Sequence, residues 1–349
     1  MRTKARPIRR TRKEVIDVTV VLLDGGYAST AVGPIEVFHS AGMLWNWLKG
    51  ESLAPRFRVR TVSLDGRGVT SICSLGLRPE GSIADIERTD VVIVPASGWD
   101  VMDRIAKNTA LIPWLRKVHA NGAYVVGICT GVSFLAEAGL LDGRQATTHW
   151  GVAEVMRERY PSVDWHPDQF VTEDARVMCS GGVYASIDIS LHIVEKFCGR
   201  EVALQCAKSL LLSMPRDRQS GYAVLPVSRP HADDRVRKAE DYLRRHMHET
   251  VTIEDLAARV AMSPRNFVRR FKAATGRVPG AYLQALRVAA AKELLERGSL
   301  PILGVCAQIG YEDVGSFRGI FKRHTGMTPA EYRDRFTNMH LERGELAAG

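Results

Sequence analysis

The order of apolar and polar positions divides the chain into two regions with different periods. In the first region, short apolar runs rich in β-branched residues occur at 15–23, 90–95 and 124–128, each bounded by turn residues. Such runs are typical of strands in a parallel sheet covered on both faces. Segments with a helical period fill the gaps, and this alternation predicts a doubly wound α/β domain. Helices are expected at 34–48, 109–120, 132–139, 151–160, 183–197 and 200–213.

Beyond this region the pattern becomes helical throughout. Residues 214–233 contain three prolines and few periodic apolar positions, which predicts a linker between domains of 14–213 and 234–336. The second domain contains a repeat at an offset of 50 residues, because FKAATGRVPGAY (271–282) aligns with FKRHTGMTPAEY (321–332). Ala257 with Ala307 and Phe267 with Phe317 bring the identities in register to eight, which indicates a duplicated helical unit.

Each unit has the plan of a helix, a short turn and a second, capped helix. In the first unit, Thr252 is expected to cap one helix with Asp255 three residues later, and Ser263 to cap the next, with Pro264 at its first position. In the second unit, Asp313 is the expected cap of a helix that runs to about residue 324. This order predicts two helix-turn-helix motifs.

The second helix of each unit has a buried face and an exposed face. Phe267 and Phe271 are four residues apart, and so are Phe317 and Phe321, so each pair is expected inside its unit. The remaining faces are basic and are either solvated or in contact with DNA. The candidate DNA-binding residues are Ser263, Arg265, Asn266, Val268, Arg269, Lys272, Gly315, Ser316, Arg318, Lys322 and Arg323.

The net charge of +9 at pH 7 is unevenly distributed. Residues 1–13 carry +7, residues 234–336 carry +7, and residues 14–233 carry −4. A basic region joined to an acidic body indicates a nucleic-acid-binding module attached to a domain with another role. The basic tail is interpreted as a disordered, solvated end or as a DNA-touching arm. Residues 337–349 form a second tail.

Other compartments and cofactors are excluded by simple features. The apolar run Val18–Leu23 is far too short to cross a membrane and leads into Asp24, so it is no secretory signal either. Six cysteines without metal-binding spacing or disulfide-rich density fit a reducing cytoplasm. We therefore expect a cytoplasmic protein with no metal and no cofactor.

The segment GICTG (127–131) is the sharpest chemical signal in the α/β region. Glycines on both sides of Cys129 permit a tight strand-to-helix turn, which is expected to expose the cysteine above the sheet. A thiol beside a helix N-terminus ionises more easily, and His149 is the nearest plausible base. The alternative is a small buried cysteine that only fills a turn.

The helical domain resembles the tandem helix-turn-helix domain of AraC/XylS-type bacterial transcription regulators, through DLAARVAMSPRNFVRRFKAATGRVPGAYL and GYEDVGSFRGIFKRHTGMTPAEYRDRF. The resemblance implies a seven-helix module whose two recognition helices enter successive major grooves. It also implies base contacts by Arg265, Val268 and Arg269, with Ser316 and Arg318 as candidates in the second unit. Since Gly319 stands where the family often has arginine, the second helix is expected to contact mainly phosphates.

The α/β region (15–213) resembles the DJ-1/PfpI, glutamine-amidotransferase-like domain of many such regulators, through GPIEVF (33–38), CTGVSFLAEAGLLDGRQATTHW (129–150) and SGGVYASIDISLHIVE (180–195). The resemblance implies a flavodoxin-like fold, dimerisation and small-molecule sensing. Where relatives are enzymes, the cysteine works with a histidine or carboxylate, but the usual Pro-Gly-Gly loop is here Pro-Ala-Ser-Gly (95–98), which disfavours catalysis. The candidate effector-binding residues are Cys129, Thr130, His149, Ser97, Gly98, Trp99 and Glu36.

Together these features favour a homodimeric, nucleoid-associated regulator that binds promoter DNA and works with RNA polymerase. Its activity, expected to be activation, would be controlled by a small effector, and nitrogenous metabolites are the class that the resemblance suggests. Two alternatives stay open. One is a cysteine-dependent amidase or hydratase in which Cys129, His149 and Glu36 act together, and the other is a thiol redox sensor based on Cys129.

Overall fold

The computed structural model describes residues 15–212, 219, 221–222, 228, 231–297 and 300–337. The chain forms two compact units, Met1–Gln219 and Ser220–Gly349, and each is described by itself. The predictions for the basic tail 1–13 and for residues 338–349 lie outside the described residues. In the described part of the chain, no helix is long and apolar enough to span a membrane.

The first unit is built on a seven-stranded sheet in the order β10-β11-β7-β6-β1-β2-β5. Neighbouring strands are parallel except for β10, which runs antiparallel to β11. The three predicted strands are confirmed as the adjacent central strands β1, β6 and β7, and the doubly wound fold class is confirmed. The strands are β1 (Ile16–Val21), β2 (Phe57–Ser63), β5 (Gly81–Ser82), β6 (Val91–Val94), β7 (Tyr124–Ile128), β10 (Val171–Asp174) and β11 (Val177–Ser180).

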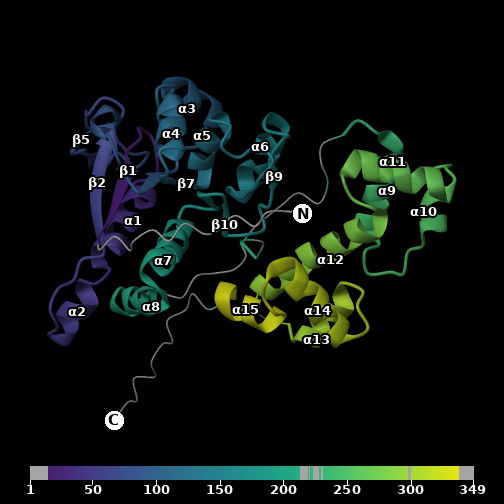
Figure 1. Cartoon of the computed structure of the whole chain (residues 1–349). Helices are drawn as coiled ribbons and strands as arrows, with labels where there is room; N and C mark the ends of the chain where they lie inside the picture. Colours follow the sequence, from purple (N-terminus) through teal and green to yellow (C-terminus); the bar gives the residue numbers. More distant parts are fainter. Residues whose placement is uncertain are drawn as a thin grey trace, which may run out of the picture. The chain divides into compact units, whose positions relative to one another are not determined.

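Helices cover both faces of this sheet (Figure 1). Along β6, Val92 and Val94 pack toward one face and Val91 and Ile93 toward the other, which explains its uninterrupted apolar sequence. The first face is covered by α3 (Val101–Lys107), α4 (Leu111–Ala120), α5 (Val132–Glu137) and α6 (Ala153–Arg159). The second face is covered by α1 (Ser29–Ser40), α7 (Ala185–Cys198) and α8 (Arg200–Ser209).

Short elements complete the unit. They comprise the strands β3 (Val69–Thr70), β4 (Gly76–Leu77), β8 (Gln145–Ala146) and β9 (Asp164–Trp165), and the 3-10 turns η1 (Ile83–Asp85), η2 (Cys129–Gly131) and η3 (Trp150–Val152). They lie in the segments between the longer strands and helices.

The helix expected at 34–48 is wrong as a single element. The chain forms α1, which starts five residues earlier, and then a separate helix α2 (Leu44–Lys49). Gly42 lies between them with a φ of 75°, and a Cβ there would lie 2.0 Å from the carbonyl oxygen of Ala54. The break therefore depends on a close backbone approach that a periodic pattern does not report.

The second unit contains seven helices among the described residues, and α12 joins its two halves (Figure 1). Leu286 of α12 packs into the first core, whereas Ala291 and Leu295 pack into the second. The helices are α9 (Asp234–Arg245), α10 (Ile253–Arg259), α11 (Pro264–Thr275), α12 (Pro279–Glu296), α13 (Ile302–Gln308), α14 (Val314–Thr325) and α15 (Pro329–Thr337).

The sequence repeat is also a repeat of geometry. The rings of Phe271 and Tyr282 meet edge to face at 5.3 Å and 87°, and those of Phe321 and Tyr332 do so at the same distance and angle. Each first helix-turn-helix phenylalanine, Phe267 or Phe317, packs on the next at 5.4 or 5.5 Å. All four phenylalanines are fully buried, as the sequence predicts.

Candidate functional site

The first helix-turn-helix motif consists of α10, a short turn and α11. Thr252 caps α10 by accepting a hydrogen bond from the backbone N–H of Asp255, and Pro264 starts α11, both as predicted. Ser263 occupies the N-cap position of α11, but its side chain makes no capping hydrogen bond, so this part of the prediction is wrong. The fixed φ of Pro264 and its missing N–H already suit a helix start without that bond.

The exposed face of α11 is basic. Arg265, Arg269 and Lys272 are exposed, and Arg269 Nη2 donates a hydrogen bond to Asn266 Oδ1 at 3.0 Å. Val268 was expected to be free to meet DNA, but its side chain is half-buried and packs against the core of the first half. Ser263 is exposed at the start of the same helix.

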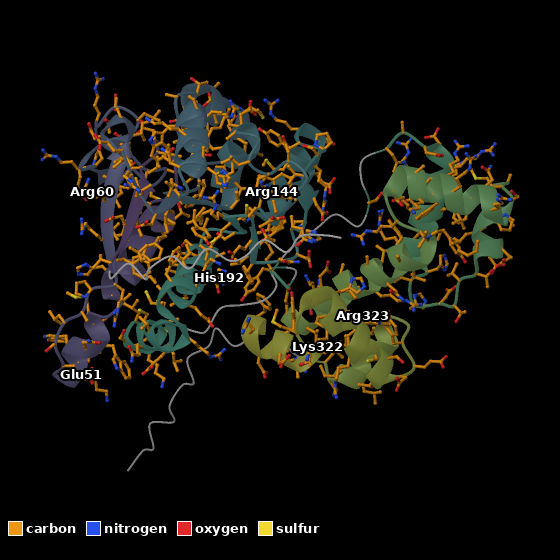
Figure 2. All side chains as sticks on the ribbon, in the orientation of Figure 1. Glu51, Arg60, Arg144, His192, Lys322 and Arg323 are labelled. Atoms are coloured by element: carbon orange, nitrogen blue, oxygen red, sulfur yellow. The ribbon has the colours of Figure 1, made fainter. Side chains whose placement is uncertain are left out.

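The second motif consists of α13, a turn at residues 310–313 and α14. Asp313 caps α14 by accepting a hydrogen bond from the backbone N–H of Ser316, as predicted. Lys322 and Arg323 both come from α14, in its last turn (Figure 2). The predicted residues on the exposed face of α14 are all solvent-accessible, namely Gly315, Ser316, Arg318, Lys322 and Arg323.

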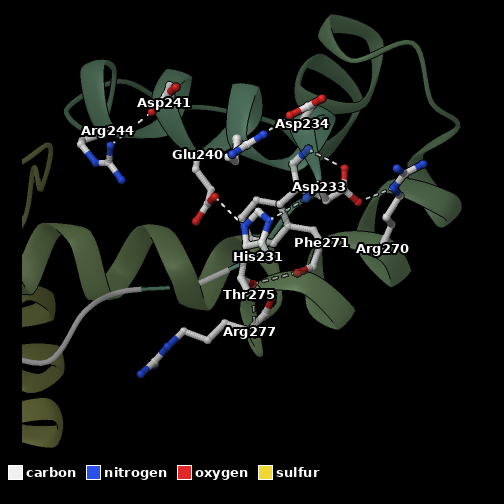
Figure 3. A network of polar contacts seen from close by, with 12 residues as sticks. His231, Asp233, Asp234, Glu240, Asp241, Arg244, Arg270, Phe271, Thr275 and Arg277 are labelled. Carbon is white, nitrogen blue, oxygen red and sulfur yellow. Dashed lines mark hydrogen bonds and ion pairs between the residues drawn. The ribbon is translucent and has the colours of Figure 1, made fainter. Parts of the chain in front are cut away.

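A polar network joins the start of α9 to the recognition helix α11 (Figure 3). His231 Nε2 lies 2.8 Å from Glu240 Oε2, and His231 Nδ1 accepts the backbone N–H of Asp233 at 3.2 Å. The Asp233 carboxylate caps α9 and also forms an ion pair with Arg270 of α11. The orientation of α11 is therefore held in part by Asp233, at the start of α9. Sequence patterns did not indicate this network, because its members have no helical or repeat spacing.

In the first unit, the turn after β7 has the predicted elbow geometry. Cys129 is a non-glycine residue with a φ of 56°, a strained conformation that is concentrated at functional sites. A Cβ on Gly127 would lie 2.8 Å from Cα of Val132, and one on Gly131 would lie 2.2 Å from the carbonyl oxygen of Pro95. Both glycines are therefore needed for this turn, as the sequence predicts.

The Cys129 side chain itself is buried, with only 5% of its surface exposed. Burial raises the pKa of the thiol from 9.0 to about 11, although the backbone N–H groups of Thr130 and Gly182 act in the opposite direction. The expectation of an exposed, easily ionised thiol is wrong. Loss of hydration outweighs two backbone dipoles, because a charge in a low-dielectric site is costly unless it is fully compensated.

Several predicted effector residues lie together around this turn. Thr130 Oγ1 accepts the backbone N–H of Ser97 at 3.0 Å, and Thr148 Oγ1 donates to the carbonyl oxygen of Cys129 at 2.9 Å. Ser97 is completely buried, and its hydroxyl has no hydrogen-bond partner among the described residues. The loops that follow β6 and β7 thus form one small polar region.

His149 lies on the other side of this region. Its Nδ1 accepts the backbone N–H of Gly151 at 3.0 Å, and a Cβ on Gly182 would lie 4.0 Å from its ring. The Gly182 N–H faces the Cys129 thiol, so His149 is a neighbour of the cysteine site. Burial lowers the pKa of His149, which keeps the ring neutral at pH 7.

Glu36 lies on an exposed position of α1, and no hydrogen bond or ion pair in the described part of the chain joins it to the turn at Cys129, so its role in the site stays a prediction. The side chain of α1 that reaches the loop after β6 is Thr30, whose Oγ1 accepts the backbone N–H of Ala96 at 3.1 Å. Because α1 starts earlier than the apolar pattern predicts, no sequence pattern singles out Thr30.

Gln219, which was assigned to the linker, is buried in the first unit with 2% exposure. Its Nε2 donates to the carbonyl oxygens of Thr148 and Gln169 at 2.8 and 3.0 Å, and a Cβ on Gly181 would lie 2.1 Å from that nitrogen. The chain that leaves this unit therefore contacts the same backbone segments that surround Cys129. Its polar, proline-flanked sequence gave no sign of burial.

Comparison with known proteins places these observations in a family. The DJ-1/PfpI family profile matches residues 16–196, and a helix-turn-helix domain profile matches residues 256–335. The chain is 29% identical over 281 residues to the HTH-type transcriptional regulator CdhR of Pseudomonas aeruginosa, which covers 80% of this chain and 82% of that protein.

Two further matches cover about half of the chain each. An isonitrile hydratase of Pseudomonas putida is 31% identical over 150 residues, which is 43% of this chain and 63% of that enzyme. The crystal structure of an AraC family transcriptional regulator from Pseudomonas putida matches with a TM-score of 0.47 and 24% identity, over 56% of this chain and 99% of that one.

Proposed function

Because the chain belongs to the DJ-1/PfpI family and carries an AraC-type helix-turn-helix domain, we propose that it is a transcription regulator whose DNA binding is controlled by a small effector. The observation that carries this proposal is the duplicated motif, with the same buried skeleton in both halves and basic residues on both exposed faces. The α/β unit supplies the effector site, at the loops after β6 and β7.

The DNA-binding role follows from the two exposed helix faces. Arg265 and Arg269 present guanidinium groups that suit base edges in the major groove, and Lys272 and Lys322 suit phosphates. The Asn266 side chain holds Arg269, which reduces the freedom lost on binding. In this proposal the regulator acts in the cytoplasm on promoter DNA as a homodimer and activates transcription together with RNA polymerase.

The effector site would take a small metabolite, and nitrogenous compounds are the first class to test. Support comes from the polar region formed by Ser97, Thr130, Cys129 and His149, beside the exposed ring of Trp99. Gly98 adopts a φ of 93°, and a Cβ there would lie 2.8 Å from the carbonyl oxygen of Gly25. Gly98 therefore lets the loop after β6 approach the loop after β1 beside this region.

The test selects DNA that the full chain binds from a random-sequence pool and then measures the affinity of the chain for that DNA. Affinity should fall with salt, with a log–log slope of about −0.9 for each phosphate neutralised. Lys272→Ala and Lys322→Ala should each reduce that slope by roughly one unit. The control, Lys238→Ala, removes an exposed lysine from α9, outside both motifs, and should leave the slope unchanged. Equal effects of all three substitutions would contradict the assigned faces.

A cysteine-dependent enzyme is the second candidate, and the isonitrile hydratase match is the observation that favours it. The buried thiol with its raised pKa speaks against nucleophilic use at neutral pH, and also against a thiol redox sensor. Alkylation should therefore be slow at Cys129 and faster at the exposed Cys73. Rapid alkylation of Cys129 at pH 7, with turnover of an isonitrile that Cys129→Ser abolishes, would favour the enzyme.

A further inference from the structure

The proposed effector site has a neighbouring region that no sequence pattern indicates, at the carboxyl ends of β1 and β6. In the sheet, β1 lies between β2 and β6, so the chain continues to one side after β1 and returns on the other. Doubly wound sheets bind ligands in the crevice outside such a reversal point. The loops after β1 and β6, residues 24–27 and 95–99, form this edge.

Arg104 of α3 lies against both loops. A Cβ on Gly25 would be 2.6 to 2.9 Å from the guanidinium group, and a Cβ on Gly98 would be 3.6 Å from its Nε. Both glycines have positive φ values, 67° and 93°. The two loops thus leave room for the guanidinium group where any larger residue would displace it.

The guanidinium group is poorly satisfied by the protein. Its one hydrogen bond to a described residue is a long one, from Nη1 to the carbonyl oxygen of Asp24 at 3.4 Å. Its Nε is buried without a partner among the described residues. The nearby Asp24 carboxylate accepts the backbone N–H of Thr70 instead. Burying an arginine donor without an acceptor costs free energy, which a bound anion would recover.

The surroundings of Arg104 suit a small organic molecule. The Ser97 hydroxyl, one residue from Gly98, is also buried and unpartnered in the described part of the chain. Trp99 is 65% exposed and meets Tyr27 edge to face at 5.8 Å. The loops therefore offer a cation, a free hydroxyl and an aromatic surface within a few residues of one another.

We propose that Arg104 binds the carboxylate of the effector, which is a small carboxylic acid whose remainder lies against Trp99. This inference rests on the proposed function, since it names the ligand class of the same site. A carboxylate fits better than a phosphate, because a planar guanidinium pairs with its two oxygens and matches its single charge. The other cation on α3, Lys107, is already paired with Asp103.

The experiment measures ligand binding to the full chain by thermal shift and by tryptophan fluorescence. The probes are amino acids, hydroxy acids and dicarboxylic acids, each compared with its own amide, and inorganic phosphate. Carboxylates should raise the melting temperature and change the fluorescence, whereas their amides and phosphate should not. Arg104→Met should weaken the binding of the best carboxylate about 10- to 100-fold, and Arg104→Lys should weaken it less. Lys107→Met, which removes a charge one turn away on the same helix, is the control.

The outcomes separate this inference from the proposed function. Equal binding of acids and amides, unchanged affinity in Arg104→Met, or no response to any carboxylate at millimolar concentration would overturn the role of Arg104. Far-ultraviolet circular dichroism identifies a variant that fails to fold. If Arg104→Met does not fold, the affinity of Arg104→Lys for the carboxylate tests the proposal, because an ammonium group keeps the charge but cannot form two parallel hydrogen bonds. Binding of the selected DNA, measured on the same samples, tests the regulator separately. If the wild-type chain binds no selected DNA, the proposed function is overturned.

Discussion

The two helix-turn-helix halves have the same interior and different exteriors. Phe271 and Phe321 occupy equivalent positions and pack in the same way on Tyr282 and Tyr332. On the exposed faces, Arg269 of the first half corresponds to Gly319 of the second. Packing constrains every atom of a core, whereas an exposed face is constrained only by what it binds. The two interiors therefore have equal structural roles, and we propose that the two exposed faces have unequal roles in reading DNA.

The largest expected effect concerns the shared interior. Phe271→Ala and Phe321→Ala should each lower the free energy of unfolding by about 3–5 kcal/mol, because each leaves a cavity in a fully buried aromatic cluster. Urea unfolding of the full chain gives the total loss, and hydrogen exchange shows which half opens. A much smaller loss in one half would mean that the two interiors are not equivalent.

The next effect concerns the difference in the exposed faces. Arg269→Ala should weaken binding of the selected DNA by about 1–3 kcal/mol and relax the preference at one base pair. Arg318→Ala in the second half should weaken binding of all sequences alike, as expected for a phosphate contact. Binding measured on a library of single-base variants distinguishes the two patterns. A change of preference with Arg318→Ala would assign base reading to both halves.

A smaller effect is expected at the polar network that joins the start of α9 to α11. Asp233→Ala removes the N-cap of α9 and the partner of Arg270 at once. The lost cap should cost about 1 kcal/mol in thermal unfolding, and the partly exposed ion pair should add little. Asp233→Asn keeps a side chain that can cap α9 but removes the charge, so the difference between Asp233→Ala and Asp233→Asn gives the capping effect. Leu283→Ala, at the equivalent position 50 residues later, is a control for the loss of packing alone.

A change of similar or smaller size would make the second half more like the first. Gly319 is exposed on α14, and a Cβ there would meet nothing within 4 Å. Gly319→Arg should stabilise the helix by roughly 0.5–1 kcal/mol and tighten DNA binding. Gly319→Ala separates helix stability from the new charge, since it should reproduce only the stability gain. A gain in stability against unfolding without tighter DNA binding would place α14 away from the DNA.

The smallest effect is a dependence on pH. Burial, followed by Arg277, Arg323 and Lys292, lowers the pKa of His324 from 6.5, and the first half has Ala274 at this position. The unfolded chain then binds the proton more readily than the folded one, so stability falls as pH drops below about 6.5. In His324→Ala this part of the acid sensitivity should disappear, as measured by melting temperature between neutral and mildly acidic pH. An unchanged profile would assign it to other groups.

The candidate effector site was predictable only in part. The elbow glycines of Gly-x-Cys-x-Gly require a close backbone approach, and this local need is visible in the residue types. Whether Cys129 ionises is decided by what covers it, and two residues that contact it, Thr148 and Gly182, come from elsewhere in the chain. From the residue types, Cys129 is expected to be either a reactive thiol or a small buried turn residue, and the fold produces the buried one.

The sequence by itself determined the two-region organisation, the central strands and the duplicated motif, because periodicity, capping residues and repeat spacing are local properties. Only the tertiary structure decided that Cys129 is buried, that Gln219 lies inside the first unit and that Arg104 reaches two glycine loops. Each of these depends on contacts between segments far apart in the chain. Burial and the loss of hydration that follows from it are properties of the assembled fold, so no pattern within one segment contains them.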